Sequence, residues 1–328
     1  TALTYHICKH AEEDCAMVGN IGYSFARQVA TDPKKLYIAE ISSFQLDDIT
    51  SFRPDVAVLT NITEDHLDRY EYKVQNYINS KFNITKYQVP GDVFIYNLDD
   101  ETTMNNITNY PIQSTPAPLS MSKELPQGAY LVNAKMHLKW KSEEMQMSVD
   151  DFAIKGKHNQ YNNMAASLAS AAVYIRKDKI REALQTFESL EHRMEPAGMI
   201  KGVEFINDSK ATNINSTWFA LESMQKPVIL ILGGVDKGND YNLLKELVKE
   251  KVKAIVCMGA DNRKIHEAFG DIVSLMLNTQ NAQEAVQAAF HFSNKGDVVL
   301  LSPACASFDL FKNYEDRGTQ FKQAIKDL

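Results

Sequence analysis

Short apolar runs alternate with amphipathic stretches along the second half of the chain, and this alternation predicts strands followed by helices. The apolar runs lie at Val203–Asn207, Val228–Leu232, Ala254–Met258, Ile272–Leu277 and Val298–Leu301. Helical spacing follows them at Asn215–Ser223, Leu243–Lys251, Arg263–Phe269, Ala282–Phe292 and Phe311–Lys326. Consecutive βα units are typical of a parallel, doubly wound sheet, so this half predicts an α/β domain.

The first half shows the same alternation and then a change of pattern. Buried parallel strands are predicted at Leu36–Ser43, Val56–Thr63 and Val93–Asn97. Helices are predicted at Ala2–His10, Gly22–Ala30, Val74–Lys86, Asn162–Val173 and Lys177–Phe187. Residues 130–132, 136–140 and 145–149 have the pattern of short antiparallel strands. Pro196 and Gly198 interrupt the periodicity, so we place a boundary within Glu191–Gly198, between domains of residues 1–191 and 192–328.

Composition narrows the function classes. The chain has 328 residues, of which 44% are hydrophobic and 23% charged, and this balance supports about two folded domains. A net charge of −7 argues against a protein that binds nucleic acid by broad neutralisation of phosphates. The apolar runs fall far short of the roughly 18 residues that a membrane span needs, so we expect no membrane insertion. The four cysteines form no CxxC pair and no zinc spacing, which favours a reduced, cytoplasmic chain.

Polar residues that follow the predicted strands of the first half are candidates for chemistry, because ligands of open α/β sheets lie beyond the carboxyl ends of strands. Glu40 ends an apolar strand, where it either pairs with a basic residue or holds Mg²⁺ beside a phosphate. His66 lies in a dense polar segment after the next strand, a setting that favours a functional role. Asn159 and Asn162 share one face of a helix start, where carboxamides either cap the helix or grip a nucleotide.

Three strand ends in the second half carry lysines, hydroxyls and glycines near helix N-termini. Asp208–Asn213 follows the first strand, Gly233–Gly238 follows the second, and Ser302–Asp309 follows the last. Backbone N–H groups and ammonium groups in such loops bind anions. The sequence therefore predicts an anion-binding rim at this edge of the sheet.

Taken in order, these segments resemble the Mur ligases, the ATP-dependent enzymes that build the peptide stem of bacterial cell-wall precursors. The matching segments are Gly19–Gly22, Glu40–Gln45, Thr63–Tyr70, His158–Asn162, His192–Arg193, Asn207–Asn213, Gly233–Lys237 and Ser302–Asp309. The resemblance covers essentially the whole chain. Its last motif, followed by Phe311–Glu315, is similar to that of the members that add D-glutamate.

The family has three domains, and the chain resembles the second and third of them. The resemblance implies an α/β fold with a central P-loop-type mononucleotide-binding domain, followed by a Rossmann-like domain with a mostly parallel sheet. It places the family's Gly-rich phosphate-binding loop immediately before Thr1, so the central domain as given is incomplete. Without the lysine and N–H groups of that loop, we expect the chain as given to bind ATP poorly and catalyse little. We expect the parent protein to do both.

The resemblance also implies the reaction. The carboxylate of UDP-N-acetylmuramoyl-L-alanine attacks the γ-phosphate of ATP, and the amine of D-glutamate then attacks the acyl phosphate. Glu40 and His66 fall in the region of the metal and the substrate phosphate, and Asn20 falls where the family meets the UDP-sugar. Positions that match nucleotide contacts are Asn159, Asn162, Arg193 and Asp208. Positions that match contacts with phosphate or D-glutamate are Lys210, Thr212, Lys237, Ser307, Phe308 and Tyr314.

Three positions need separate comment. The family commonly carries Phe at Tyr314 and Leu at Phe308, and because both changes keep an apolar body we expect altered packing rather than altered reaction. Lys81 read by itself is a solvated helix residue. The resemblance instead matches it to the lysine that becomes carbamylated and helps to hold the second of two Mg²⁺ ions.

Two rival functions stay open at this point. The chain could be a non-catalytic module that binds a small anion, which the complete set from Glu40 to Lys237 argues against. Folylpolyglutamate synthetase has the same architecture, and the Ser302–Asp309 motif argues against that function.

Overall fold

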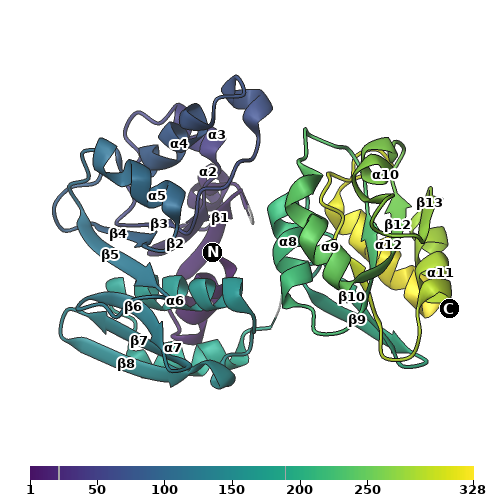
Figure 1. The fold of residues 1–328 in the computed structure, drawn as a ribbon. Helices are drawn as coiled ribbons and strands as arrows, with labels where there is room; N and C mark the ends of the chain where they lie inside the picture. The colour runs from purple at the N-terminus through teal and green to yellow at the C-terminus, as the bar shows by residue number, and fades with distance from the viewer. Residues whose placement is uncertain (21–22, 189) are drawn as a thin grey trace. The chain divides into compact units, whose positions relative to one another are not determined.

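The computed structural model describes residues 1–20, 23–188 and 190–328. The chain divides into two compact units, Thr1–Glu188 and Ser189–Leu328, and each is described by itself below (Figure 1).

The first unit is built on a six-stranded sheet with the order β3-β4-β5-β6-β7-β8. Strands β3 to β6 are parallel, and β6, β7 and β8 form an antiparallel meander that extends the parallel part (Figure 1). The strands are β3 (Val56–Leu59), β4 (Val93–Asn97), β5 (Thr115–Ser120), β6 (Gly128–Val132), β7 (Lys135–Trp140) and β8 (Glu143–Ser148). A separate parallel pair consists of β1 (Cys15–Gly19) and β2 (Leu36–Glu40).

Helices cover this sheet and close its core. The α-helices are α1 (Ala2–His10), α2 (Phe25–Thr31), α3 (Ser43–Asp47), α4 (Val74–Phe82), α5 (Glu101–Asn106), α6 (Lys157–Ala172) and α7 (Lys177–Thr186). The 3₁₀ turns are η1 (Leu67–Tyr70), η2 (Asn83–Thr85), η3 (Ile107–Asn109) and η4 (Val149–Asp151). Helix α1 packs on α6 and α7, and Leu3 and Ile7 enter the same apolar cluster as Met164 and Leu168. Burying these side chains removes apolar surface from water, which is the main force that holds α1 in place.

The second unit is a six-stranded sheet with the order β13-β12-β11-β14-β10-β9. Its strands are β9 (Glu195–Ile200), β10 (Val203–Asn207), β11 (Val228–Leu232), β12 (Val252–Met258), β13 (Met276–Thr279) and β14 (Val298–Leu301). All neighbours are parallel except β9, which forms an antiparallel edge with β10. Every residue of β11 is buried, as expected for a central strand covered on both faces.

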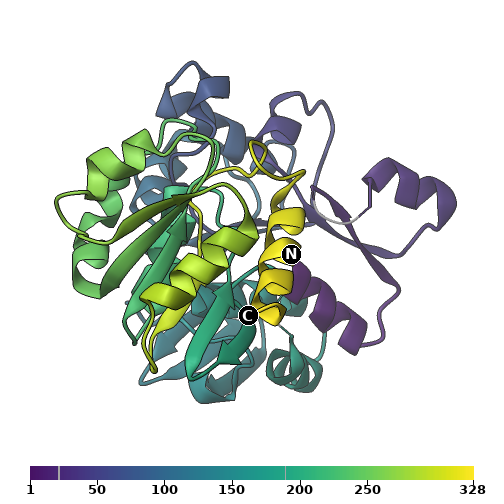
Figure 2. The ribbon, with the colours of Figure 1, turned by 90° about the vertical axis from the view of Figure 1, so that its right-hand side faces the viewer.

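Helices lie on both faces of this second sheet. They are α8 (Ile214–Ser223), α9 (Lys245–Lys251), α10 (Arg263–Phe269), α11 (Ala282–Phe292) and α12 (Tyr314–Lys326), with the 3₁₀ turn η5 (Tyr241–Leu244). One apolar cluster joins the sheet to α8, η5, α9 and α10, and another joins its other face to α11 and α12. Figure 2 shows the yellow α12 beside the yellow-green α11, which it contacts. The predicted α/β class and the mostly parallel sheet are therefore confirmed.

The structure differs from the sequence prediction where strands are short, polar or rich in proline. Strands β1, β5 and β9 were not predicted. Two prolines, Pro116 and Pro118, obscured β5. Proline lacks the backbone N–H that pairs strands. The backbone nitrogens of both prolines point toward β6, however, and β6 pairs with β5 only from Leu119 onwards, so no hydrogen bond is lost. Strand β9 occupies residues 195–200, where Pro196 and Gly198 predicted an interruption. The predicted strand at Ile272–Leu277 is shifted, because β13 begins at Met276.

Candidate functional site

The three strand ends that predicted an anion-binding rim belong to neighbouring strands. Strand β14 lies between β10 and β11, so the loops that begin at Asp208, Ser302 and Gly233 emerge side by side. All three strands run in the same direction, and their carboxyl ends therefore meet at one edge of the sheet.

Backbone hydrogen bonds join the loop after β11 to the loop after β14. The N–H of Val235 donates to the carbonyl of Ala306 at 2.8 Å, and the N–H of Ala306 donates to the carbonyl of Val235 at 3.3 Å. Gly234 has a φ of +132°, and a Cβ there would lie 2.2 Å from the carbonyl oxygen of Ala306. Only glycine fits this approach, which fixes the loop that carries Lys237 against the loop that carries Ser307.

Asp208 is a buried carboxyl at the end of β10. Its oxygens accept hydrogen bonds from the Ser302 hydroxyl at 2.8 Å and from the Met194 N–H at 3.2 Å. Burial raises the pKa of Asp208 to about 7, against the lowering effects of these hydrogen bonds and of the Arg193 and Arg317 charges. Such a group changes its proton occupancy near neutral pH, a property found often at functional sites.

Arg317 is a second buried charge, which the sequence analysis missed. It lies on α12 with 1% of its surface exposed, and its guanidinium donates to the Ser209 hydroxyl, the Ser209 carbonyl and the Cys305 carbonyl at 2.8–3.1 Å. Burial lowers the pKa of Arg317 to about 10. The signal was available: Arg317 takes a core position in the stripe that continues through Phe321 and Ala324.

Lys210 and Tyr314 form a direct contact across the same rim. The Nζ atom of Lys210 donates to the Tyr314 hydroxyl at 3.1 Å and lies 4.6 Å from the centre of the tyrosine ring. We expected the tyrosine to change packing only, but its oxygen adds a polar contact that phenylalanine lacks. At the other predicted positions of this rim, Lys237 and Arg193 are exposed, Thr212 is half-buried, and Ser307 is buried. Phe308 is 71% exposed.

His192 forms a backbone hydrogen bond with the loop that carries Lys210. Its carbonyl accepts the Lys210 N–H at 3.0 Å, and its ring nitrogen Nδ1 lies 2.9 Å from the Asn207 amide. A Cβ on Gly318 would lie 2.2 Å from that nitrogen, so the ring needs a glycine beside it. Glu191, His192 and Glu195 have ligand atoms close enough to hold a metal ion, but the Lys322 ammonium donates to both carboxylates. We therefore interpret this cluster as an ion-pair network.

The predicted metal and UDP-sugar residues of the first unit lie after β1, at the end of β2, before η1 and in α4. Gly19 pairs with Glu40, and a Cβ on Gly19 would lie 2.3 Å from the Glu40 carbonyl oxygen. The Asn20 amide donates to the Glu40 carboxylate at 3.4 Å. Asn20 thus lies beside the proposed metal ligand. Ile21 and Gly22, which complete the predicted Gly19–Gly22 motif, lie outside the described residues.

Phe44 links the Glu40 segment to His66. Helix α3 starts with a capping box in which the Ser42 hydroxyl accepts the Gln45 N–H and the Gln45 side chain accepts the Ser42 N–H. This start places the Phe44 ring 4.9 Å from the His66 ring, edge to face. His66 itself has a left-handed φ of 54°, and its N–H donates to Asp65 at 2.9 Å.

Lys81 is held in the same region through its neighbour Ser80. The Ser80 hydroxyl donates to the Ser43 carbonyl at 2.7 Å and ties α4 to α3. Among the described residues, the Lys81 ammonium has no ion pair or hydrogen bond; it lies 4.9 Å from the centre of the Tyr77 ring. Burial lowers the pKa of Lys81, while the Asp65 charge raises it. Lys81 is half-buried, which is less solvated than the helix-surface lysine that the isolated sequence predicted.

Asn159 and Asn162 lie in the first turns of α6, on one face as predicted. The Asn162 amide donates to the Asn159 side-chain oxygen at 3.2 Å, and the Asn159 amide donates to the Lys155 carbonyl at 2.7 Å. Both side chains are half-buried, and their mutual bond fixes their orientation.

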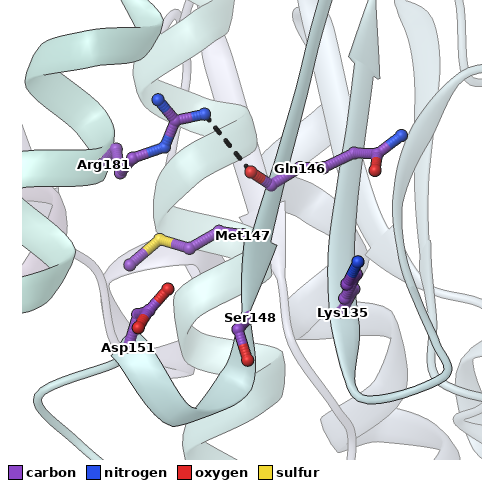
Figure 3. Close-up of a pocket in the computed structure, with 6 residues that line it drawn as sticks. All are labelled: Lys135, Gln146, Met147, Ser148, Asp151 and Arg181. Atoms are coloured by element: carbon purple, nitrogen blue, oxygen red, sulfur yellow. Dashed lines mark hydrogen bonds between the residues drawn. The ribbon is translucent and has the colours of Figure 1, made fainter.

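A pocket in the first unit is separate from all of these residues. It is lined by Lys135, Gln146, Met147, Ser148, Asp151 and Arg181 (Figure 3). The Arg181 guanidinium donates to the Gln146 carbonyl at 3.3 Å, while the Gln146 side chain extends away from Arg181 (Figure 3). Because the charged groups do not converge, we assign this pocket no role.

Comparison with known proteins decides the family. Residues 1–170 match the family described as Mur ligase middle domain, and residues 192–305 match the family described as Mur ligase, glutamate ligase domain. The chain belongs to the Mur ligase family. This Mur ligase is 50% identical over 328 residues to the UDP-N-acetylmuramoylalanine–D-glutamate ligase of Christiangramia forsetii, with 100% of this chain and 74% of that protein covered. It is 46% identical to the protein of the same name from Bacteroides fragilis, again with 100% and 74% covered.

Solved structures share the fold of this Mur ligase. The MurF ligase from Thermotoga maritima in complex with ADP aligns with a TM-score of 0.71 at 14% identity, over 99% of this chain and 77% of that one. The pseudomurein peptide ligase type C from Methanothermus fervidus aligns with a TM-score of 0.67 at 15% identity, over 99% and 75%. No helix among the described residues of this Mur ligase is long and apolar enough to cross a membrane.

Proposed function

We propose that this Mur ligase forms an amide bond between UDP-N-acetylmuramoyl-L-alanine and D-glutamate at the expense of ATP, in the synthesis of peptidoglycan precursors. The observation that carries the proposal is the 50% identity, over the whole chain, to a relative named for this activity. The geometry of the site supports it, because the basic and hydroxyl groups that an anionic amino acid and a phosphate require lie on adjacent strand ends.

The two domains predicted from the sequence have different roles in this proposal. Residues 1–191 act as the central ATPase domain, and residues 192–328 act as the amino-acid-binding domain. ATP accepts attack at its γ-phosphate by the carboxylate of the UDP-sugar substrate, and ADP leaves. The amine of D-glutamate then attacks the acyl phosphate, loses a proton and displaces inorganic phosphate. We place the adenine nucleotide against Asn159, Asn162, Arg193 and Asp208, whose polar groups suit bases, riboses and phosphates. The cytoplasmic location stays a prediction.

Two Mg²⁺ ions fit the donor chemistry of the first unit. Glu40 supplies a carboxylate and His66 an imidazole, and the α3 capping box and Phe44 hold the two segments together. Bound Mg²⁺ would neutralise phosphate charge. Asn20 orients the Glu40 carboxylate and faces the UDP-sugar.

Lys81 completes this set as a carbamate. Its side chain is half-buried and its amine has no hydrogen-bonding or ion-pairing partner among the described residues, a state that is costly for an ammonium. The neutral amine adds to CO₂ and releases one proton, and the product is a carboxylate-like anion. That anion supplies the oxygen ligand that the cluster of Glu40 and His66 lacks.

The rim of the second unit binds D-glutamate and the transferred phosphate. Lys210, Thr212 and Lys237 supply charge and a hydroxyl from the loops after β10 and β11. Ser307, Phe308 and Tyr314 supply a hydroxyl, an apolar wall and an aromatic ring from the segment after β14, the strand that lies between β10 and β11. The mutual bonding of Val235 and Ala306 sets the distance between the loop of Lys237 and the loop of Ser307 before the substrate arrives.

The test is release of inorganic phosphate by the complete enzyme with ATP and Mg²⁺. We expect release to require both UDP-N-acetylmuramoyl-L-alanine and D-glutamate, with a product whose mass is their sum less one water. L-Glutamate is the matched control, and we expect it to be at least about 100-fold poorer, since the chiral centre decides which groups meet the rim. Turnover with a reduced folate and L-glutamate would instead establish a folylpolyglutamate-synthetase-like ligase. Anion binding without any turnover would establish a non-catalytic module.

A further inference from the structure

The first turn of α12 contacts the loop that follows β10 at two places. One is the Ser209 residue of the loop, and the other is the side chain of its Lys210. Tyr314 and Arg317 are three positions apart and so share a helix face. The Tyr314 carbonyl accepts the Ser209 hydroxyl at 2.8 Å, and Arg317 binds the Ser209 hydroxyl and carbonyl. The Tyr314 hydroxyl accepts a hydrogen bond from the Lys210 ammonium, which the ring also faces.

We propose that Tyr314 is a positioning residue: its hydroxyl fixes the Lys210 ammonium where the carboxylate of the incoming amino acid binds. This rests on the proposed function, and it gives the phenol oxygen a task that the aromatic ring alone does not perform. An ammonium has donors and no acceptor, so the phenol oxygen must accept. The ring face attracts the same cation. The ammonium carries three donors, so a bond to the phenol is compatible with binding an anion.

The Lys210 side chain needs a partner to fix the position of its ammonium group, because lysine has four rotatable bonds and a compact charge. A hydrogen bond from a charged donor is directional, whereas the ring contact fixes only an approximate distance. The phenol oxygen therefore determines the direction in which the Lys210 ammonium points. Arg317 and Ser209 make the support rigid, since the guanidinium anchoring the loop is fully buried.

The first experiment is the Tyr314→Phe variant of the complete enzyme, which removes one oxygen and keeps the ring. We expect the KM for D-glutamate to rise about tenfold, while kcat changes less than about twofold and the KM for ATP is unchanged. A general loss of structure would instead lower kcat and the melting temperature together. An unchanged KM for D-glutamate would overturn the inference.

The chain contains a matched control. Lys141 donates to the Tyr174 hydroxyl at 3.1 Å and lies 4.9 Å from the ring centre, so this pair repeats the geometry in the first unit, at residues to which we assign no role. Tyr174 is 78% exposed. We expect the Tyr174→Phe variant to leave every kinetic constant unchanged. A tenfold change in KM for D-glutamate in this variant would show that loss of any such oxygen acts through overall structure.

A double-mutant cycle separates positioning from direct contact. In a Lys210→Ala background, we expect Tyr314→Phe to change the KM for D-glutamate less than about twofold, because the group that it positions is absent. If the tenfold rise persists there, the hydroxyl acts without Lys210 and the inference is wrong.

A direct readout keeps the inference separate from the proposed function. If the wild-type enzyme does not ligate D-glutamate, the proposed function fails by itself. The ¹⁵N signal of the Lys210 ammonium is measured in either case by nuclear magnetic resonance. We expect it to shift on adding D-glutamate in the wild type, and to lose that shift in Tyr314→Phe. A wild type without a shift, or a variant that retains it, would overturn the inference whatever the kinetics show.

Discussion

Lys81→Ala tests the proposed carbamate, and the structure allows the size of each effect to be worked out. The change removes a half-buried side chain whose amine lies over the Tyr77 ring and has no ion pair or hydrogen bond among the described residues. Loss of the ring contact costs about 0.5–2 kcal/mol of folding free energy. Removing a desolvated amine offsets part of this. We therefore expect the variant to be folded, with a stability within about 1–2 kcal/mol of the wild type.

The expected effect on catalysis is far larger. A charged group that acts at the transition state is worth about 3–4 kcal/mol, so kcat for phosphate release falls by roughly 100- to 1,000-fold. Acetate or formate fits the space left by the alanine and supplies the missing carboxylate. We expect either acid to restore part of the activity of Lys81→Ala, and to leave the wild type unaffected.

Lys86→Ala is the matched control for this experiment. Lys86 follows η2, is exposed, and also lies over a tyrosine ring, 5.3 Å from the centre of Tyr87. We expect this variant to keep wild-type turnover. Labelling with ¹³CO₂ gives a direct readout, a carbamate resonance present in the wild type and Lys86→Ala but absent from Lys81→Ala. Near-wild-type turnover by Lys81→Ala would refute the reasoning. A loss of turnover that neither acetate nor formate restores, together with no carbamate resonance in the wild type, would refute it as well.

Three further predictions concern stability, each measured by chemical or thermal unfolding. Burial raises the folded pKa of Asp208 to about 7, so its contribution to stability is present below the unfolded pKa of about 4 and is lost as pH rises towards 7. Asp208→Asn should remove that loss and flatten the pH profile over this range, and an unchanged profile would contradict the assignment. Arg317→Met leaves the Ser209 and Cys305 carbonyls without their donor and should cost about 3–5 kcal/mol; a loss below about 1 kcal/mol would mean that water replaces it. Gly19→Ala should cost more than Gly91→Ala, because both glycines have positive φ but only Gly19 faces a carbonyl, at 2.3 Å; equal losses would place the cost in φ alone.

Much of the second unit could be predicted because its central strands are apolar on both faces. Strands β10, β11 and β14 and helices α10 and α11 begin and end at the predicted residues. A run such as Val228–Leu232 has only one stable solution, a strand covered by helices on both sides. The adjacency of these strands was not predictable in detail, because β14 returns from the far end of the chain to lie between β10 and β11.

The candidate functional residues also divide into some that the sequence could predict and some that it could not. Glycine, lysine and hydroxyl motifs after strands were visible in the sequence, because ligand chemistry demands those residue types at strand ends. Their supports were not visible. Arg317 reaches Ser209 and Cys305 across more than one element, and His192 needs the space that Gly318 leaves. Such contacts depend on the packing of α12 against the sheet, which no local pattern encodes.

Each unit holds, among its own candidate residues, a cation without a carboxylate ion pair: Lys81 is half-buried and Arg317 is fully buried. Among the described residues, neither Lys81 nor Arg317 has an ion-pair partner, and burial lowers the pKa of both. Burial of a charge opposes folding unless its hydrogen-bonding groups are satisfied. Arg317 and Lys81 accommodate a positive charge away from water in different ways. Arg317 spreads its charge over a planar group and satisfies its donors with carbonyls and a hydroxyl, which keeps a fixed positive field beneath the rim. Lys81 has no such acceptors and is the one whose charge carbamylation would reverse. A guanidinium keeps its charge and suits anion binding, whereas an amine can be converted and suits metal binding; the residue type at each centre matches the role proposed for it.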